Sequence, residues 1–165
     1  MNFKIGPAVL LEISDTEISE LLSRVYVDGG FVAPEVATTL FEPLAVRSRG
    51  RLICARDKQN LTLAGMVIVV YPDSPARRLA QGDETEMHLL GVKPDYREFG
   101  LGRLLVAAAI EDAKQAGYSK MILWTQLTMH AAHRLYESAG FVRLPGMDFN
   151  RGGRDFWVYE GVLKD

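Results

Sequence analysis

The residues best suited to chemistry lie between Thr85 and Gly102, where a strand gives way to a glycine-containing turn and then to a helix. The turn holds Gly100 and Gly102, with Arg97 and Arg103 on either side. The first amide groups of a helix lack intrahelical partners, and the helix dipole adds partial positive charge at the same end. Because glycines let a ligand approach the backbone closely, the segment predicts a pyrophosphate site.

This segment is neither of two common nucleotide-binding loops. No Gly-Lys-Ser/Thr follows the glycines, and no Gly-x-Gly-x-x-Gly occurs in it. A second interpretation of the glycines stays open, in which Gly100 and Gly102 only shape a strand-to-helix turn. The glycines by themselves do not separate the two interpretations.

The elements around this loop alternate between strand-like and helix-like stretches. Runs of aliphatic and β-branched residues predict strands at residues 7–13, 51–56, 61–71, 85–92, 120–125, 141–144 and 155–163. Apolar residues at helical spacing predict helices at residues 15–27, 34–47, 101–116 and 128–139. Residues 57–60, 72–82 and 147–154 are predicted turns and loops. This order predicts one α/β domain over residues 1–165, with antiparallel hairpins first and a β-α-β crossover in the middle.

The composition is that of a globular protein. The chain has 165 residues, of which 48% are hydrophobic and 24% charged, which argues against disorder, collagen and coiled coil. The apolar stretch at residues 63–71 is too short for a membrane span, which needs about 20 residues. The net charge of −2 offers no overall attraction to nucleic acid or anionic lipid. Glu12 and Asp15 interrupt the N-terminal apolar patch, so we expect no signal peptide and a cytoplasmic protein. From the charge, we expect no nucleic-acid or membrane partner.

A second segment, Ala-Ala-His-Arg-Leu-Tyr-Glu-Ser-Ala-Gly-Phe at residues 131–141, is also informative. With the first segment, it resembles the GNAT superfamily of acetyl-CoA-dependent N-acetyltransferases. The family's central motif, V-x-P-x-x-R/Q-x-x-G-x-G/A before a helix, is matched by Val92, Pro94, Arg97, Gly100 and Gly102. Its later motif, A-x-x-L-Y-E-x-x-G-F, is matched by Ala132, Leu135, Tyr136, Glu137, Gly140 and Phe141. The resemblance implies a GNAT-like fold, a mixed central sheet of about seven strands flanked by about four helices.

The resemblance implies acetyl-CoA as cosubstrate and no metal. In the family, the strand before the central motif splays from its neighbour at a bulge, and the pantetheine arm lies in the gap. Carried over, Leu90, Gly91 and Val92 contact pantetheine, and a glycine suits a strand distortion in any case. The implied pyrophosphate ligands are the backbone amides of Glu98, Phe99, Gly100, Leu101, Gly102 and Arg103. Arg97 supplies charge and turn geometry, or else is a solvated arginine.

The resemblance also implies two catalytic residues. Tyr136 matches a tyrosine that lies near the acetyl-CoA sulfur in many members, and a phenol with a pKa near ~10 can donate a proton to the leaving thiolate. Glu86 lies six residues before Val92, where several members place a catalytic glutamate, and would help deprotonate the amine. His88 can serve in the same relay. Strand alternation puts Glu86, His88, Leu90 and Val92 on one face. Otherwise Tyr136 is a packed aromatic, and the other two are polar residues at a sheet surface.

One position departs from the family pattern. Many members carry asparagine seven residues before the tyrosine, and this chain has Met129. Thr125, Gln126 and Thr128 lie close enough in sequence to supply the missing polar contact. This departure concerns the pantetheine contact more than the fold.

The remaining histidines and the cysteine predict neither a metal site nor a catalytic nucleophile. His130 and His133 lack a third ligand and are interpreted as surface histidines rather than a metal site. Cys54 cannot form an intrachain disulfide, and it fits a buried structural thiol better than a nucleophile.

The function that the resemblance implies is transfer of the acetyl group to a primary amine, by direct attack in a ternary complex. A backbone amide near Val92 would polarise the thioester carbonyl. The acceptor stays open as a small molecule or a peptide. The acceptor pocket could be lined by three aromatic residues, Tyr26, Phe31 and Phe41, which could instead be core aromatics. The loop at residues 150–154 could bind a carboxylate or phosphate, or could be a solvated turn. The alternative is a non-catalytic acyl-CoA-binding sensor or regulatory module on the same fold, and a homodimer is possible.

Overall fold

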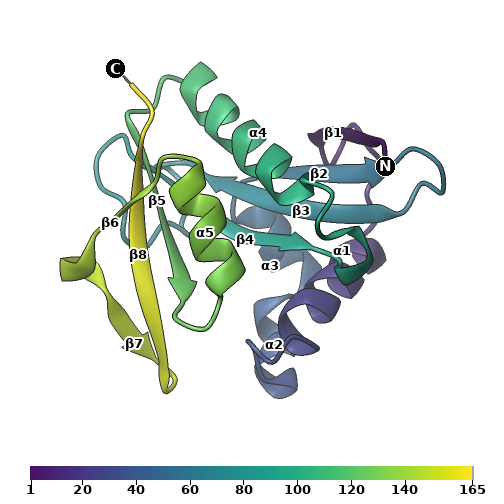
Figure 1. Cartoon of the computed structure of the whole chain (residues 1–165), viewed down its shortest axis with the longest axis horizontal. Helices are drawn as coiled ribbons and strands as arrows, with labels where there is room; N and C mark the ends of the chain where they lie inside the picture. Colours follow the sequence, from purple (N-terminus) through teal and green to yellow (C-terminus); the bar gives the residue numbers. More distant parts are fainter. Residues whose placement is uncertain (165) are drawn as a thin grey trace.

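The computed structural model describes residues 1–164, which form a mixed α/β fold around one sheet (Figure 1). The described strands are β1 (Phe3–Pro7), β2 (Arg51–Asp57), β3 (Leu63–Val70), β4 (Thr85–Val92), β5 (Lys120–Gln126), β6 (Val142–Arg143), β7 (Phe149–Arg151) and β8 (Arg154–Val162). The α-helices are α1 (Asp15–Leu22), α2 (Pro34–Leu40), α3 (Pro43–Ser48), α4 (Leu101–Gln115) and α5 (His130–Ser138). A π-helical turn, Ser23–Val27, continues α1, and 3-10 turns lie at Pro94–Tyr96 and Pro145–Met147.

The sheet has the order β1-β2-β3-β4-β5-β8-β6, and β7 pairs with β8. Neighbouring strands from β1 to β4 are antiparallel, β4 and β5 are parallel, and β5 and β8 are antiparallel. The helix α4 provides the crossover between the two parallel strands, as a β-α-β unit requires. The predicted mixed sheet is confirmed, with eight strands in the described residues where about seven were predicted.

Helices pack on both faces of the sheet and divide the core. On one face, α4 and α5 lie over the sheet, and Leu101, Leu105 and Ala109 of α4 are buried along the predicted stripe (Figure 1). On the other face, α1 buries Ile18 and Leu21. Each helix therefore presents one apolar face to the sheet, as the helical spacing of its apolar residues predicts.

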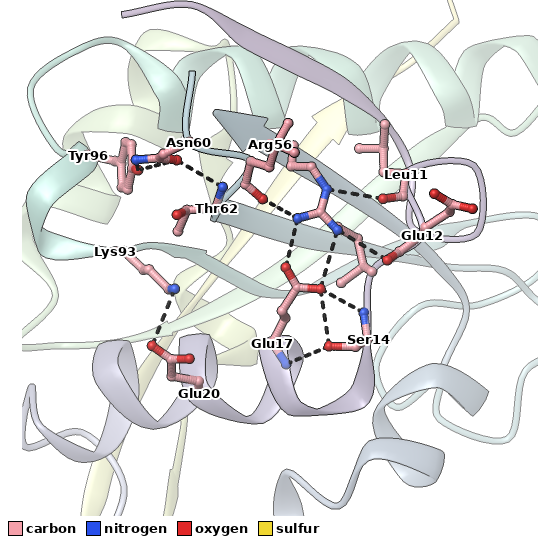
Figure 2. Close-up of polar contacts among 12 residues, drawn as sticks. Leu11, Glu12, Ser14, Glu17, Glu20, Arg56, Asn60, Thr62, Lys93 and Tyr96 are labelled. Carbon is pink, nitrogen blue, oxygen red and sulfur yellow. Dashed lines mark hydrogen bonds and ion pairs between the residues drawn. The ribbon is translucent and has the colours of Figure 1, made fainter. Parts of the chain in front are cut away.

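The first strand lies earlier than predicted. Residues 7–13 were predicted as a strand, but β1 ends at Pro7, and Leu11 N–H donates back to Pro7 O in a turn. Glu12 has a φ of 53°, and the Arg56 guanidinium binds the carbonyls of Leu11 and Glu12 (Figure 2). The segment is apolar because Ala8 and Leu11 pack into the core from a turn, which hydropathy alone does not separate from a strand.

The Arg56 side chain also joins α1 to the sheet. It forms an ion pair with Glu17 at 2.7 Å, and Glu17 in turn completes a capping box with Ser14 at the start of α1 (Figure 2). Burial alone would raise the pKa of Glu17, but the hydrogen bonds from Arg56 and Ser14 outweigh it and lower that pKa. The N-terminal turn is thus anchored to β2 by side-chain contacts that no local pattern predicts.

Two other predicted elements are divided in the structure. The helix predicted at residues 34–47 breaks after α2, because a residue before proline disfavours helical backbone and Pro43 starts α3 with Glu42 as its N-cap. The loop predicted at residues 147–154 contains β7, and only Gly152 and Gly153, both at positive φ, form the turn into β8.

Candidate active site

The site begins where β4 and β5 separate. These parallel strands pair only at Thr85 with Met121 and Glu86 with Ile122. Beyond that point β5 keeps its pairing with β8 as far as Gln126, while β4 keeps its pairing with β3 (Figure 1). The sheet is therefore split between β4 and β5 over the second half of both strands.

A bulge in β4 lies within the split. Gly91 is opposite Met66, and His88 is opposite Ile68. Leu89 and Leu90 of β4 therefore both face Val67, the single β3 residue between Met66 and Ile68. Leu89 has a φ of 50°, in the left-handed region. This is the extra residue of a β-bulge, which re-aims the side chains that follow it.

The bulge makes the predicted alternation along β4 wrong. Met87, Leu90 and Val92 pack into the cluster beneath α4 and α5, whereas Glu86 and His88 lie on the opposite face. The extra residue shifts the side-chain period by one, so residues on the two sides of the bulge exchange faces. Gly91 itself is not the bulge, because it pairs with Met66. It lies under α1, where an added Cβ would come 3.3 Å from Leu21 Cδ2.

At the end of β4, the chain forms a cradle of free backbone amides. None of the amide groups of residues 98–103 donates a hydrogen bond to residues 1–164. Glu98 and Gly100 have φ values of 68° and 78°, and left-handed residues between helical ones turn successive amides toward one concavity. The predicted amides therefore lie together and unpaired at the N-terminus of α4, where an anion is stabilised.

The other residues of the loop shape the cradle. Arg97 Nε donates to Val92 O at 3.1 Å, which ties the loop to the end of β4 and leaves the guanidinium exposed beside it. Leu101 is buried beneath α4, while Phe99 is 52% exposed and Arg103 is exposed on the first turn of the helix. An added Cβ at Gly102 would lie 3.1 Å from Leu135 Cδ2, so this glycine also permits contact between α4 and α5.

Tyr136 lies in the cluster that includes Leu90 and Val92, and only 7% of it is exposed. Its hydroxyl makes no hydrogen bond to residues 1–164 and is not sealed from solvent. Burial, with the phenol of Tyr26 nearby, raises the pKa of Tyr136 above the usual range. The hydroxyl therefore keeps its proton at physiological pH and can donate a hydrogen bond to a ligand.

Glu86 is fully buried at the closed end of the split. Its carboxylate accepts backbone hydrogen bonds from Arg78, Leu79 and Ala80, at 2.5 to 3.0 Å, and lies 2.8 Å from Nε2 of His88. Burial alone would raise the pKa of Glu86, but these hydrogen bonds outweigh it and lower that pKa. Glu86 is thus a fixed anion, with little remaining capacity to accept a proton.

His88 lies two residues further along β4 and is the side-chain partner of the Glu86 carboxylate. Because Glu86 is a carboxylate, Nε2 of His88 carries the proton, and Nδ1 lies 3.3 Å from Nη1 of Arg49. Burial lowers the pKa of His88, the neighbouring arginines Arg49 and Arg78 lower it further, and Glu86 opposes them. The ring is neutral at physiological pH and packs edge-on against Trp124, with centroids 4.8 Å apart.

The residues considered for the Met129 position are mostly engaged elsewhere. Thr125 donates to Sδ of Met129 at 3.5 Å, and Gln126 Nε2 donates to Phe31 O at 2.8 Å. Arg154 joins Gln126 Oε1 to Gly30 O. These bonds tie the loop after the π-helical turn to the end of β5.

The prediction that His133 is a surface histidine is wrong. His133 is buried, stacks on Trp157 with centroids 4.8 Å apart, and contacts Gln126 O through Nε2. Its position on α5 faces β8, which its sequence spacing from His130 does not show. Cys54 is buried, as was predicted, and burial raises the pKa of its thiol to about 12.

Residues 1–164 also contain neither a membrane-spanning helix nor a cluster of metal ligands. No helix there is long and apolar enough to cross a membrane. No group of three or more histidine, cysteine, aspartate or glutamate side chains there has the arrangement of a metal site.

The family of the chain follows from comparison with known proteins. The family model described as the acetyltransferase (GNAT) family matches residues 16–141, which include the split, the amide cradle and Tyr136. The chain therefore belongs to the GNAT acetyltransferase family, as its two motifs indicate.

Individual relatives agree with this assignment. The chain is 35% identical over 95 residues to a mycothiol acetyltransferase of Cellulomonas flavigena. The matched region covers 57% of this chain and 27% of that protein. The chain spans less than two thirds of the length of the curated relatives that it matches. The fold superposes on a GNAT-family protein of Desulfovibrio desulfuricans with a TM-score of 0.75 at 20% identity, covering 99% of this chain and all of that one. The fold also superposes on an acetyltransferase of Bacillus subtilis solved in complex with CoA, with a TM-score of 0.67 at 20% identity. This superposition covers 96% of this chain and 97% of that one.

Proposed function

We propose that the protein is an N-acetyltransferase that moves the acetyl group of acetyl-CoA to a primary amine within a ternary complex. The observation that carries this proposal is the placement of two features on one strand. A buried His88–Glu86 pair lies where β4 leaves β5, and the cradle of free amides follows the other end of β4. One strand thus carries a proton acceptor at one end and an anion site at the other, with the bulge between them.

The cradle supports binding of the cosubstrate. Six consecutive amides at residues 98–103 have no hydrogen-bond partner within residues 1–164. They match a pyrophosphate at a helix N-terminus, and Arg97 adds positive charge beside them. Leu90, Gly91 and Val92 lie along the split at the bulge and are the proposed pantetheine contacts. Acetyl-CoA supplies an activated acyl group with a thiolate leaving group.

The chemistry requires one proton to leave and another to arrive. The amine nitrogen attacks the thioester carbonyl carbon, an N–C bond forms, and the C–S bond breaks. We assign the proton from the amine to Nδ1 of His88, because burial and Arg49 keep that ring neutral, and the amine there takes the place of the Arg49 Nη1 contact at 3.3 Å. Glu86 is then a positioning residue, which fixes the tautomer and stabilises the imidazolium. Tyr136 donates its proton to the departing sulfur.

The Glu86–His88 pair favours an enzyme over a sensor. Binding an acyl-CoA needs the amide cradle and the split but no buried histidine–carboxylate pair. Burying an ionised carboxylate is costly without full hydrogen bonding, and here three backbone amides and a histidine supply it. Binding of an acyl-CoA does not by itself require that arrangement.

The direct test combines binding and turnover. We expect acetyl-CoA to bind, by titration calorimetry, with a Kd at or below about 100 μM. We also expect free thiol to be released when a mixed panel of primary amines is added. Binding without thiol release on any amine would support the sensor instead. Absence of binding would remove the cradle assignment and the proposed activity together.

A further inference from the structure

A pocket lies beside the Glu86–His88 pair. It has a volume of about 240 Å³ and is lined by Arg78, Leu79, Trp124, Phe149, Asn150 and Arg151. These residues come from the β3–β4 loop, from β5 and from all three positions of β7, so three distant segments form one concavity. Two links connect it to the pair, since Glu86 binds the backbone of Arg78 and Leu79, and His88 packs on Trp124.

The pocket has an unbalanced positive charge. Arg78 and Arg151 line it, and both lie near enough to Arg49 to lower its pKa, after the larger effect of burial. None of these three arginines forms an ion pair with a carboxylate of residues 1–164. Glu86 is already saturated by three amides and His88, and Asp155 contacts Asn150 on the neighbouring strand. The charge is therefore available to a ligand.

Apart from Asn150, the rest of the pocket is apolar. The rings of Trp124 and Phe149 meet edge to face, with centroids 6.3 Å apart, and Phe149 stacks on Phe156 at 5.0 Å. Leu79 packs in the same cluster. Such a wall accommodates the hydrocarbon or aromatic body of a small molecule, and a planar guanidinium recognises a carboxylate or phosphate with paired hydrogen bonds.

We propose that the acceptor is a small primary amine that carries an anionic group and an apolar body, as an apolar amino acid does. The anionic group pairs with Arg78 and Arg151, and the apolar body lies against Trp124 and Phe149. His88 does not line the pocket but packs on Trp124, which does, and the amine is proposed to reach His88 past the edge of that ring. This inference rests on the proposed acetyltransferase function and names the substrate class of the same site.

The test compares acceptors that differ only in charge. Leucine, methionine, phenylalanine and tryptophan are each assayed against their amides, with acetyl-CoA held constant and thiol release as the readout. The aminophosphonate analogue of phenylalanine separates a preference for phosphate-like groups from one for carboxylates. We expect kcat/KM to be at least about ten-fold higher for the anionic member of a pair. This is the change that the free energy of one hydrogen bond to a charged group usually produces.

Matched variants locate that preference in the pocket. In Arg78→Gln and Arg151→Gln we expect KM for the anionic acceptor to rise about ten-fold, with no change for its amide. Both side chains are exposed, and the Arg78 amide that binds Glu86 is retained, so the fold is preserved. Lys114→Gln, which removes an exposed charge at the end of α4, is the control and should change neither acceptor.

The outcomes separate this inference from the proposed function. Equal turnover of acids and amides would overturn the substrate class and leave the acetyltransferase intact. Failure of acetyl-CoA to bind would overturn both. If acetyl-CoA binds and no acceptor turns over, N-acetylphenylalanine and its amide are titrated by tryptophan fluorescence. Tighter binding of the acid in the wild type, lost in Arg151→Gln, supports the proposal, and equal binding of acid and amide overturns it.

Discussion

The hydroxyl of Tyr26 donates a 2.7 Å hydrogen bond to the carbonyl of Leu90, across 64 residues of sequence. Tyr26 lies in the π-helical turn after α1, and Leu90 is one of the two bulge residues of β4. The bond therefore connects the helix that covers one face of the sheet to the irregular backbone inside the split. Single π-turns within helices often accompany functional sites, and this one places a phenol at the bulge.

We predict that Tyr26→Phe loosens the bulge. Loss of one buried hydrogen bond should cost about 1 kcal/mol of unfolding free energy and lower Tm by about 2–4 °C. Because Leu90 is a proposed pantetheine contact, the Kd for acetyl-CoA should also rise a few-fold. Tyr71→Phe is the matched control, since its hydroxyl binds Asp112 away from the split. It should lose similar stability with an unchanged Kd, and an unchanged Kd in Tyr26→Phe as well would separate the bulge from binding.

The Glu86–His88 pair predicts a specific pH dependence. His88 must be unprotonated to accept a proton, and its lowered pKa means that kcat/KM should be constant near neutral pH and fall only below about pH 6.5. His88→Gln should lower kcat about a hundred-fold, because general base catalysis typically contributes at least that much. His130→Gln, at an exposed position on α5, is the control and should keep both the rate and the profile.

Glu86→Gln tests whether the carboxylate acts through His88. Glu86 raises the pKa of His88 against burial, so its removal should lower that pKa further and move the acid limb of kcat/KM to lower pH. A carboxylate that itself took the proton would show no such shift, and its loss would abolish the limb. The measurement is the pH profile of kcat/KM, recorded at temperatures below the Tm of the variant.

Tyr136→Phe should slow the chemistry without weakening the fold. The Tyr136 hydroxyl has no hydrogen-bond partner among residues 1–164, so its removal should leave Tm nearly unchanged. If it protonates the departing thiolate, kcat should fall about a hundred-fold while the Kd for acetyl-CoA stays constant. Tyr159→Phe removes a hydroxyl that binds Glu137, so it should lower Tm and keep kcat. A wild-type kcat in Tyr136→Phe, with chemistry rate-limiting, would remove this residue from the mechanism.

Gly100→Glu should abolish acetyl-CoA binding. The position is open, with no atom within 4 Å of an added Cβ, but its φ of 78° strains any other side chain by about 1–2 kcal/mol. Gly100→Gln carries the same strain without the charge, so the difference in Kd between the two variants measures repulsion of an anion at the cradle. Equal Kd values by calorimetry would contradict a pyrophosphate at residues 98–103.

The sequence by itself determined the parts of this protein that depend on local signals. Gly100 is needed at a left-handed position before α4, and the spacing of Leu101, Leu105 and Ala109 defines the buried stripe of that helix. The two motifs depend on short spacings and indicate the family correctly. These features are readable because each is decided within a few residues of the chain.

Only the tertiary structure decided how the candidate site is equipped. The bulge at Leu89 reversed the predicted face of Leu90, and the loop amides at residues 78–80 occupied the Glu86 carboxylate. Arg49 reaches His88 across 39 residues, and Arg78 and Arg151 meet at one pocket from separate segments. No local pattern encodes such contacts, because strand pairing and helix packing bring distant residues together. The proposed proton acceptor and the proposed acceptor pocket therefore depend on the tertiary fold, whereas the proposed anion site depends on the local sequence of the turn before α4.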